Sequence, residues 1–328
     1  MKVLVTGGAG YIGSHVVRHL RESGHEVVVY DNLSTGHAWA VGDAELIEAD
    51  LADQARLRSV LQAGRFDGVL HFAAHIVVPE SVSHPVKYYS NNTRNTLNLL
   101  ECCQEAGVRF FVFSSTAAVY GIPDTPSVGE DAPLQPINPY GASKMMSERM
   151  LMDLGAASDL RYVSLRYFNV AGADPEGRQG QSTPDATHLI KVACQAATGQ
   201  RGGITVFGTD YATADGTCER DYIHVEDLAS AHVRALDYLE HGGESQVLNC
   251  GYGCAYSVLQ VLEAVKRVSG VDFEVHYGER REGDPPALMA DAGRIRKVLG
   301  WQPAYDNLDQ IVADALAWER HCLARGIL

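Results

Sequence analysis

The chain has 328 residues, of which 46% are hydrophobic and 21% charged, so it is long enough for one large or two ordinary domains with a buried core. A formal net charge of −14 without any basic patch argues against a nucleic-acid-binding protein. No apolar run reaches membrane length, and the first residues lack the apolar stretch of a signal peptide. Seven scattered cysteines without zinc-type spacing predict free thiols, no metal and a cytoplasmic location.

The first half of the chain alternates short apolar runs with amphipathic stretches. The apolar runs predict strands at Val3–Thr6, Glu26–Tyr30, Glu45–Ala49, Gly68–Phe72, Phe110–Ser114 and Tyr162–Tyr167. Such continuous apolar strands are typical of parallel sheets covered on both faces. A helix is predicted from about Val86 to Ala106, ended by Gly107. The alternation predicts an α/β fold, a doubly wound parallel sheet of the Rossmann type.

The regular pattern fades after Asn169, and residues 171–185 are rich in Gly, Pro, Asp and Gln, which predicts a long loop. Further elements are predicted as helices at about 187–198, after Val225, and at 257–268, 291–299 and 308–323, and as strands at Thr205–Phe207 and Val247–Asn249. We therefore expect a Rossmann domain at 1–170 and a smaller, mixed α/β substrate-binding domain at 171–328. Part of about 220–250 is expected to return to the first domain.

A glycine-rich segment lies between the first predicted strand and the first predicted helix. It reads Thr-Gly-Gly-Ala-Gly-Tyr-Ile-Gly from Thr6 to Gly13, which fits both G-x-G-x-x-G from Gly8 and G-x-x-G-x-x-G from Gly7. Glycines allow a tight turn and let a pyrophosphate approach the backbone, and the helix N-terminus adds N–H donors and partial positive charge. In this context the segment predicts a dinucleotide phosphate site.

Asp31 closes the second predicted strand, near the spacing of about 20 residues that separates the last glycine from the ribose-binding carboxylate. A carboxylate at this place accepts hydrogen bonds from the adenosine ribose and repels a 2′-phosphate. The following residues, 32–36, include no Arg. The pattern therefore favours NAD over NADP, although a plain turn residue at the strand end would look the same.

Tyr140 and Lys144 form a Y-x-x-x-K pair at the start of a predicted helix, which Asn138 can cap and Pro139 can open. The two side chains share a helix face at this spacing. A free phenol has a pKa of about 10, and a nearby ammonium favours the phenolate. The pair is therefore predicted to act as a tunable proton acceptor.

Hydroxyl residues follow the fifth predicted strand, in the stretch Phe113-Ser114-Ser115-Thr116. Ligands bind at the carboxyl ends of strands in open α/β sheets, so a hydroxyl here is placed to orient a substrate oxygen beside Tyr140. The residues themselves do not decide between Ser115 and Thr116.

Together these motifs resemble the UDP-glucose 4-epimerase family of extended short-chain dehydrogenases/reductases. The matching stretches are T-G-G-x-G-Y-I-G-S-H, D-N-L, F-S-S-x-A-x-V-Y-G, P-Y-G-x-S-K, L-R-Y-F-N and R-D-Y-I-H-V, and counterparts run from Lys2 to Trp301. The resemblance implies that Tyr140 takes the proton of the sugar 4-hydroxyl while hydride passes from C4 to NAD. The 4-keto sugar then turns over and receives the hydride on its other face. It also implies that Lys144 tunes Tyr140 and contacts the nicotinamide ribose, and that Thr116 hydrogen-bonds the 4-oxygen.

The resemblance further implies two sets of binding positions. The cofactor positions are Gly7, Gly10, Tyr11, Ile12, Gly13, Asp31, Asn32, Asp50, Leu51, Phe72, Ala73, Ala74, Asn91, Lys144 and Phe168. The UDP-sugar positions are Thr116, Tyr140, Asn169, Leu189, Phe207, Arg220, Arg281 and Asp284. Guanidinium groups suit a diphosphate even in an acidic protein. A homodimer built from the helices at 87–106 and 140–156 is also implied.

Three residues depart from the pattern of some family members. Ile76 stands where some have a Lys near the cofactor, and His188 stands where some have an Asn. Leu288 occupies a position at which an aromatic residue narrows the sugar pocket and a small residue admits N-acetyl groups. Leu is intermediate in size, so we expect a preference for hexoses with some tolerance for 2-acetamido sugars.

Several alternatives stay open at this point. Related dehydratases carry Asp-Glu after the Thr, whereas this chain has Ala117-Ala118, which cannot transfer protons. A net oxidoreductase would release NADH, and a non-catalytic NAD-binding sensor would not need Tyr140 and Lys144. UDP-pentoses, UDP-glucuronate and 2-acetamido sugars share the C4 chemistry of UDP-galactose.

Overall fold

In the computed structural model, residues 1–183, 186–281 and 284–327 are described, and the chain divides into two compact units. The first comprises Met1–Gly121, Leu134–Arg166 and Ala229–Leu248, and the second comprises Ile122–Pro133, Tyr167–Leu228 and Asn249–Leu328. Ile122–Pro133 groups with the second unit although it falls in the range 1–170. The reason is that β6 (Ser127–Val128) pairs with β14 (Ala287–Ala290).

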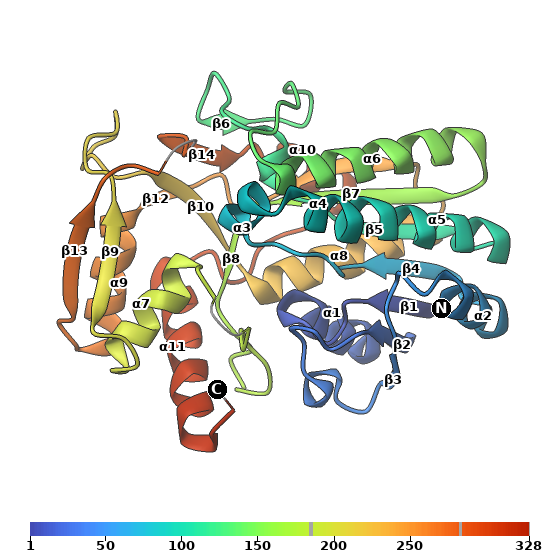
Figure 1. The fold of residues 1–328 in the computed structure, drawn as a ribbon, viewed down its shortest axis with the longest axis horizontal. Coiled ribbons are helices and arrows are strands. Elements are labelled where there is room, and N and C mark those ends of the chain that lie inside the picture. The colour runs from blue at the N-terminus through green and yellow to red at the C-terminus, as the bar shows by residue number, and fades with distance from the viewer. Residues whose placement is uncertain (184–185, 282–283, 328) are drawn as a thin grey trace. The chain divides into compact units, whose positions relative to one another are not determined.

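The first unit is built on a seven-stranded sheet with the order β11-β7-β5-β4-β1-β2-β3 (Figure 1). Its strands are β1 (Lys2–Thr6), β2 (Glu26–Asp31), β3 (Glu45–Glu48), β4 (Gly68–His71), β5 (Phe110–Ser114), β7 (Arg161–Tyr167) and β11 (Gln246–Cys250). Every pairing from β7 to β3 is parallel, so these strands end at one edge. The chain winds outward from β1 in both directions, which confirms the predicted doubly wound fold and places the switch point between β1 and β4.

Helices cover both faces of the sheet. Successive residues of a strand point to opposite faces, and both sets of side chains are buried. The helices are α1 (Tyr11–Glu22), α2 (Gln54–Gly64), α3 (Val78–Ser83), α4 (Pro85–Tyr88), α5 (Asn95–Ala106), α6 (Pro139–Ala157) and α8 (Val225–Glu240). Leu4 of β1 joins a buried cluster with Leu57 of α2, Leu99 of α5 and Leu151 of α6. Its neighbours Val3 and Val5 are fully buried on the opposite face. Both faces are therefore apolar, as the continuous strands predicted.

The single helix predicted from Val86 to Ala106 is interrupted. A π-helical stretch at Tyr89–Arg94 separates α4 from α5. Within it Asn92 is buried, donates to the Ser143 hydroxyl at 3.1 Å, and accepts from the His75 N–H at 2.9 Å. The wider turn lets this polar side chain face its partners, which hydrophobic periodicity alone cannot reveal.

The second unit contains the strand order β12-β10-β14-β6, with β8 paired to β10, and a separate pair of β13 and β9. The strands not yet bounded are β8 (Asn169–Ala171), β9 (Gly203–Phe207), β10 (Glu219–His224), β12 (Ala255–Ser257) and β13 (Glu274–Gly278). Its helices are α7 (Leu189–Ala197), α9 (Val258–Ser269), α10 (Gly293–Leu299) and α11 (Leu308–Arg325). Buried residues of α7, α9 and α11 form one core. Of the predicted loop at 171–185, residues 184 and 185 lie outside the described residues.

Candidate active site

The glycine-rich turn follows β1 and lies against the segment after β4. Gly7 has a positive φ of 71°, and a Cβ there would come within 2.4 Å of the Ala73 nitrogen. A Cβ on Gly13 would come within 2.2 Å of the Gly7 carbonyl oxygen. Only glycine fits these two positions. The turn therefore brings the first residues of α1, Tyr11 and Ile12, to the carboxyl edge of the sheet, where helix N–H groups favour an anion.

Asp31 connects the end of β2 to the glycine-rich turn. Its two carboxylate oxygens accept from the N–H groups of Ala9 and Leu33, each at 2.9 Å. A carboxylate has about four acceptor sites, so both oxygens retain capacity for ribose hydroxyls. Beside it, the Asn32 amide donates to the Asp50 carboxylate at 2.7 Å. The predicted cofactor residues at and just after the ends of β2 and β3 thus come together at one edge.

Tyr140 lies in the first turn of α6, and the predicted cap of that helix is confirmed. The Asn138 side chain accepts from the Gly141 N–H at 2.8 Å, and Pro139 is the first helical residue. Tyr140 is only 7% exposed, and its phenol is hydrogen-bonded to the Thr116 hydroxyl. The cap and this hydrogen bond fix the phenol.

Lys144, one turn further along α6, is buried and points to the end of β5. Its ammonium donates to the Ser114 carbonyl at 2.8 Å and lies 4.9 Å from the centre of the Phe113 ring. Burial lowers the pKa of Lys144 to about 7, against the opposing effect of Glu148.

The pKa of Tyr140 corrects the expectation from its sequence. Burial raises it to about 12, and the hydrogen bond from Thr116 only partly offsets this. The Lys144 ammonium is directed to the Ser114 carbonyl, and burial disfavours the charged forms of both side chains. Burial therefore opposes formation of the Tyr140 phenolate.

The two neighbouring hydroxyls that the sequence could not rank have different partners. Ser115 is fully buried and donates to the Glu148 carboxylate. Thr116 pairs with Tyr140 and also accepts from the Ala118 N–H at 3.1 Å. The geometry therefore favours Thr116 as the hydroxyl beside the phenol.

Glu148 and Arg166 form an ion pair next to Ser115, and sequence reasoning missed both residues. Their side chains are 1% and 4% exposed, and their closest atoms are 2.6 Å apart. The available signal was a charged residue four positions after Lys144, on the same helix face.

The remaining cofactor positions occupy several segments. Phe72, Ala73 and Ala74 follow β4, with the Phe72 ring 4.8 Å from the His232 ring. Leu51 is buried, and Asn91 lies in the π-helical stretch. Ile76 is 44% exposed.

Phe168 belongs to the second unit, next to Asn169 in β8. Asn169 and Leu189 line one small cavity together with Tyr222 and Trp318. The structure therefore brings together two of the predicted UDP-sugar positions in the second unit.

The other predicted UDP-sugar residues form two pairs. The Arg281 guanidinium lies 4.1 Å from the centre of the Phe207 ring, and Arg220 lies 3.5 Å from the Asp284 carboxylate. Arg220 also donates to the Pro285 carbonyl at 2.8 Å. Both guanidinium groups are thus held in place by neighbours. Leu288 is buried and is the β14 residue in register with Arg220.

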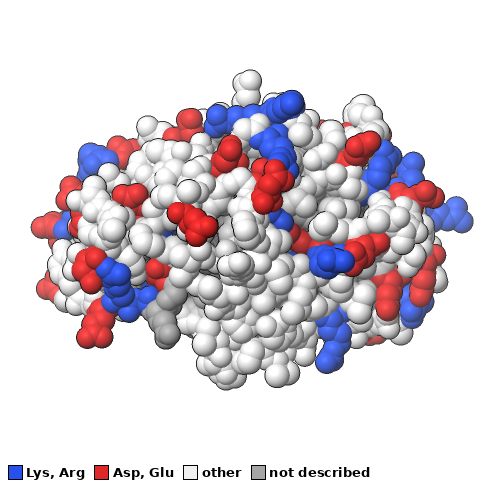
Figure 2. All heavy atoms as spheres, turned by 90° about the horizontal axis from the view of Figure 1, so that it is seen from above, with Lys and Arg blue, Asp and Glu red and all other residues white. Residues whose placement is uncertain are grey.

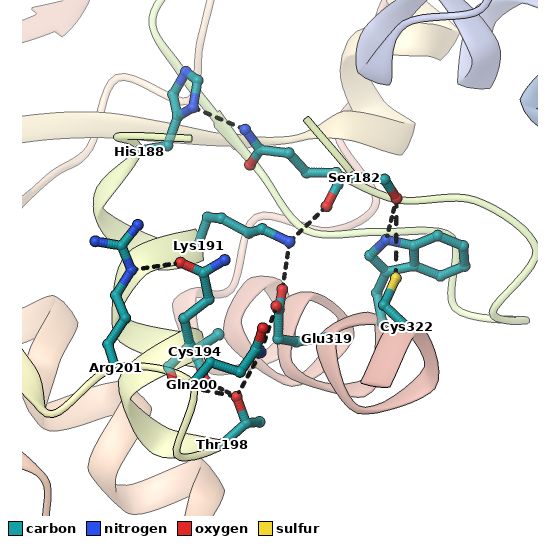
Figure 3. A network of polar contacts seen from close by, with 12 residues as sticks. Ser182, His188, Lys191, Cys194, Thr198, Gln200, Arg201, Glu319 and Cys322 are labelled. Atoms are coloured by element: carbon teal, nitrogen blue, oxygen red, sulfur yellow. Dashed lines mark hydrogen bonds and ion pairs between the residues drawn. The ribbon is translucent and has the colours of Figure 1, made fainter. Parts of the chain in front are cut away.

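A buried polar network lines the cavity that also contains Asn169 and Leu189, and Figure 3 shows it. Lys191 of α7 pairs with Glu319 of α11 at 2.5 Å and donates to the Gln181 carbonyl at 2.8 Å. The Gln181 amide lies 2.8 Å from His188 Nδ1, and burial lowers the pKa of His188. His188, one of the departures from the family pattern, is therefore held against the loop.

Three further observations concern the surface charge, the length of the helices and possible metal ligands. On the face shown in Figure 2, acidic and basic residues are interspersed. None of the described helices combines the length and apolarity needed to cross a membrane. Within residues 1–183, 186–281 and 284–327, no group of three His, Cys, Asp or Glu side chains is arranged to hold a metal.

Comparisons with known proteins agree with this geometry. The model of the NAD dependent epimerase/dehydratase family matches residues 3–251. The chain is 58% identical to the UDP-glucose 4-epimerase of Azospirillum brasilense, over 97% of this chain and 92% of that protein.

Solved structures give the same picture. UDP-glucose 4-epimerase from Brucella ovis in complex with NAD is 45% identical with a TM-score of 0.94, covering 96% of this chain and 97% of that one. The UDP-Glc/GlcNAc 4-epimerase of Campylobacter jejuni is 51% identical with a TM-score of 0.87, covering 98% and 99%. The glycine-rich turn, the Tyr140–Thr116 pair and nearly full-length similarity lead to one conclusion: this chain belongs to the NAD dependent epimerase/dehydratase family and, within it, to the UDP-glucose 4-epimerases.

Proposed function

We propose that this protein interconverts UDP-glucose and UDP-galactose by NAD-dependent epimerisation at C4, through a 4-keto sugar. The observation that carries the proposal is the buried Tyr140 phenol, hydrogen-bonded to Thr116, in a unit whose glycine-rich turn suits a dinucleotide. The relatives that match nearly the whole chain support it.

Tyr140 is the proton-transfer residue of this reaction. Its phenolic oxygen takes the proton of the sugar 4-hydroxyl and returns it to the 4-oxygen after the sugar has turned over. The Thr116 hydroxyl lies beside the same phenolic oxygen, where its hydrogen bond to the sugar 4-oxygen would keep the two oxygens aligned. Lys144 contributes positive charge at the end of β5, where its ammonium is held by Ser114.

Gly7, Tyr11, Asp31 and Asn32 would hold NAD along the edge of the sheet, because the glycine-rich turn and the Asp31 carboxylate fit its pyrophosphate and ribose. When bound, NAD would supply the hydride acceptor and donor for the sugar C4 and a positive charge that favours the Tyr140 phenolate.

The second unit is proposed to bind UDP. Arg220 and Arg281 each offer a guanidinium to the diphosphate, and Asp284 offers a carboxylate to the ribose. Asn169, Leu189 and Phe207 are proposed to contact the remaining parts of the nucleotide sugar. A stacked or carbonyl-bound guanidinium loses less conformational freedom on binding, which supports this role for both arginines.

Leu288 is proposed to set a preference for hexoses with some tolerance for 2-acetamido sugars. Its side chain is buried and intermediate in size, and the Campylobacter jejuni relative acts, by its name, on UDP-Glc and UDP-GlcNAc. The measurement is kcat/KM for UDP-galactose against UDP-N-acetylgalactosamine. Equal values would contradict the preference.

The test of the function is incubation of the purified protein with UDP-galactose and no added NAD, with products resolved by proton NMR. We expect UDP-glucose to accumulate to a stable ratio without stoichiometric release of NADH. Stoichiometric NADH would instead indicate a net oxidoreductase. Turnover of UDP-glucuronate, a UDP-pentose or a 2-acetamido sugar alone would keep the chemistry and change the substrate. No turnover with NAD bound would favour a sensor.

We also propose a homodimer in the cytoplasm. Leu97 of α5 and Met146 and Met152 of α6 are each more than 40% exposed, which is a large apolar exposure for two neighbouring helices. These helices are the ones that the resemblance implies for a dimer. All seven cysteines are free thiols, which suits a reducing compartment.

A further inference from the structure

Three successive residues at the end of β5 are each held by a different turn of α6. The Ser114 carbonyl accepts from Lys144 at 2.8 Å, the Ser115 hydroxyl donates to Glu148, and Thr116 is hydrogen-bonded to Tyr140. The three α6 residues are four positions apart and therefore share one face of the helix. The segment is thus fixed residue by residue.

Glu148 is itself fixed by Arg166 of β7. The Arg166 Nε and Nη2 donate to the Glu148 carboxylate, the shortest contact being 2.6 Å. Its Nη1 donates to the Tyr120 hydroxyl at 3.0 Å. A bidentate guanidinium–carboxylate pair has a defined geometry. Because Ser115 and Tyr120 belong to one short segment, the ion pair holds that segment at both ends.

We propose that the Ser115–Glu148–Arg166 network is a positioning device that keeps Thr116 at hydrogen-bonding distance from Tyr140. None of these three residues is assigned a contact with the sugar or the cofactor. They act by fixing the backbone that carries Thr116. The inference rests on the proposed roles of Tyr140 and Thr116 in proton transfer.

Ser115 is the best residue for a test. Removing Glu148 or Arg166 would leave the other charge buried without its partner, which destabilises the whole fold. Ser115→Ala removes one hydroxyl and keeps the ion pair. It also keeps the backbone hydrogen bond from the Ser115 N–H to Leu165, at 2.9 Å.

Ser164 supplies a matched control. It lies on β7, in register with Phe113 of β5, and is fully buried like Ser115. Its hydroxyl has no hydrogen-bond partner within the described part of the chain. Ser164→Ala therefore makes the same chemical change in the same sheet without touching the network.

The experiment measures kcat and KM for UDP-galactose, bound NAD and thermal unfolding for the NAD-containing wild type and both variants. We expect Ser115→Ala to lower kcat roughly 10- to 100-fold, since small displacements of reacting groups have effects of this size. KM and NAD content should stay close to wild type, because binding groups are untouched. Ser164→Ala should keep the wild-type kcat.

An unchanged kcat in Ser115→Ala would overturn the proposal, and so would an equal loss in Ser164→Ala. If Ser115→Ala does not fold, Tyr120→Phe replaces it, because it releases the other end of the segment while the ion pair remains. A normal kcat in folded Tyr120→Phe would then overturn the proposal. A wild type that converts no UDP-sugar would instead refute the proposed function, so the two failures are distinguishable.

Discussion

At the scale of single residues, burial and hydrogen bonding decide what the site groups can do. Tyr140 and Lys144 have the right spacing, but burial raises the pKa of Tyr140 and lowers the pKa of Lys144. Both shifts favour the neutral side chain. Thr116 is the group whose hydrogen bond counters this for Tyr140. The catalytic function therefore depends on contacts as much as on residue type.

The first prediction concerns the phenol. Tyr140→Phe should lower kcat by about 10²–10⁴-fold, because it removes the only atom that receives the proton in the proposed reaction. NAD should remain bound, since the ring is retained and the glycine-rich turn is unchanged. Turnover of UDP-galactose and NAD released on denaturation measure the two effects. Tyr162→Phe, on buried β7, is the control and should keep full activity; near-normal turnover in Tyr140→Phe would refute the role.

The second prediction concerns acid stability. His71 is fully buried, bonded to Thr6 and Thr96, and burial followed by the nearby Lys144 lowers its pKa from 6.5 to about 3. Between these values the unfolded chain binds the extra proton, so stability is full above pH 6.5 and falls as the pH drops toward 3. The slope from this residue is about 1.4 kcal/mol per pH unit.

Chemical unfolding of wild type and His71→Gln between pH 7 and pH 4 tests this. The variant should be less stable at pH 7, because it loses a fitted hydrogen-bonded ring, but it should lose less stability on acidification. If the stability of both proteins fell equally on acidification, His71 would not be the buried group that causes the loss.

At the scale of elements, the start of α6 places the proton-transfer residue. The third prediction is that Asn138→Ala lowers stability by about 1 kcal/mol and also lowers kcat, because Tyr140 lies in the uncapped first turn. Asn307→Ala is the matched control, since Asn307 caps α11 by accepting from the Gln310 N–H at 3.1 Å. It should cost similar stability and leave kcat unchanged. Equal kcat values for the two variants would contradict the coupling.

At the scale of the whole molecule, assembly and domain organisation matter. The fourth prediction is that light scattering gives twice the mass of one chain and that Leu97→Glu shifts this to one chain mass, because a charge cannot be buried in an apolar interface. Leu323→Glu, at an equally exposed position on α11, should leave the mass unchanged. A wild-type mass of one chain at micromolar concentration would rule out the dimer.

Much of this protein follows from its sequence. The apolar runs predicted the strands of the main sheet, because parallel strands covered on both faces need no polar alternation. The turn at Gly7–Gly13, the cap at Asn138 and the Tyr140–Lys144 spacing were also visible, because each depends on residues close together in the chain. The strands β6, β8, β10, β12, β13 and β14 were missed, since most of them lack the continuous apolar run that marks the main sheet.

Only the tertiary structure decided the rest. It separated Ser115 from Thr116, directed Lys144 to the Ser114 carbonyl, and paired Glu148 with Arg166. These outcomes depend on which residues of distant segments meet and on how much water they exclude. Local sequence determines turns, caps and helix faces, whereas pKa values and hydrogen-bond partners are determined by burial, which exists only once the sheet and its helices have assembled.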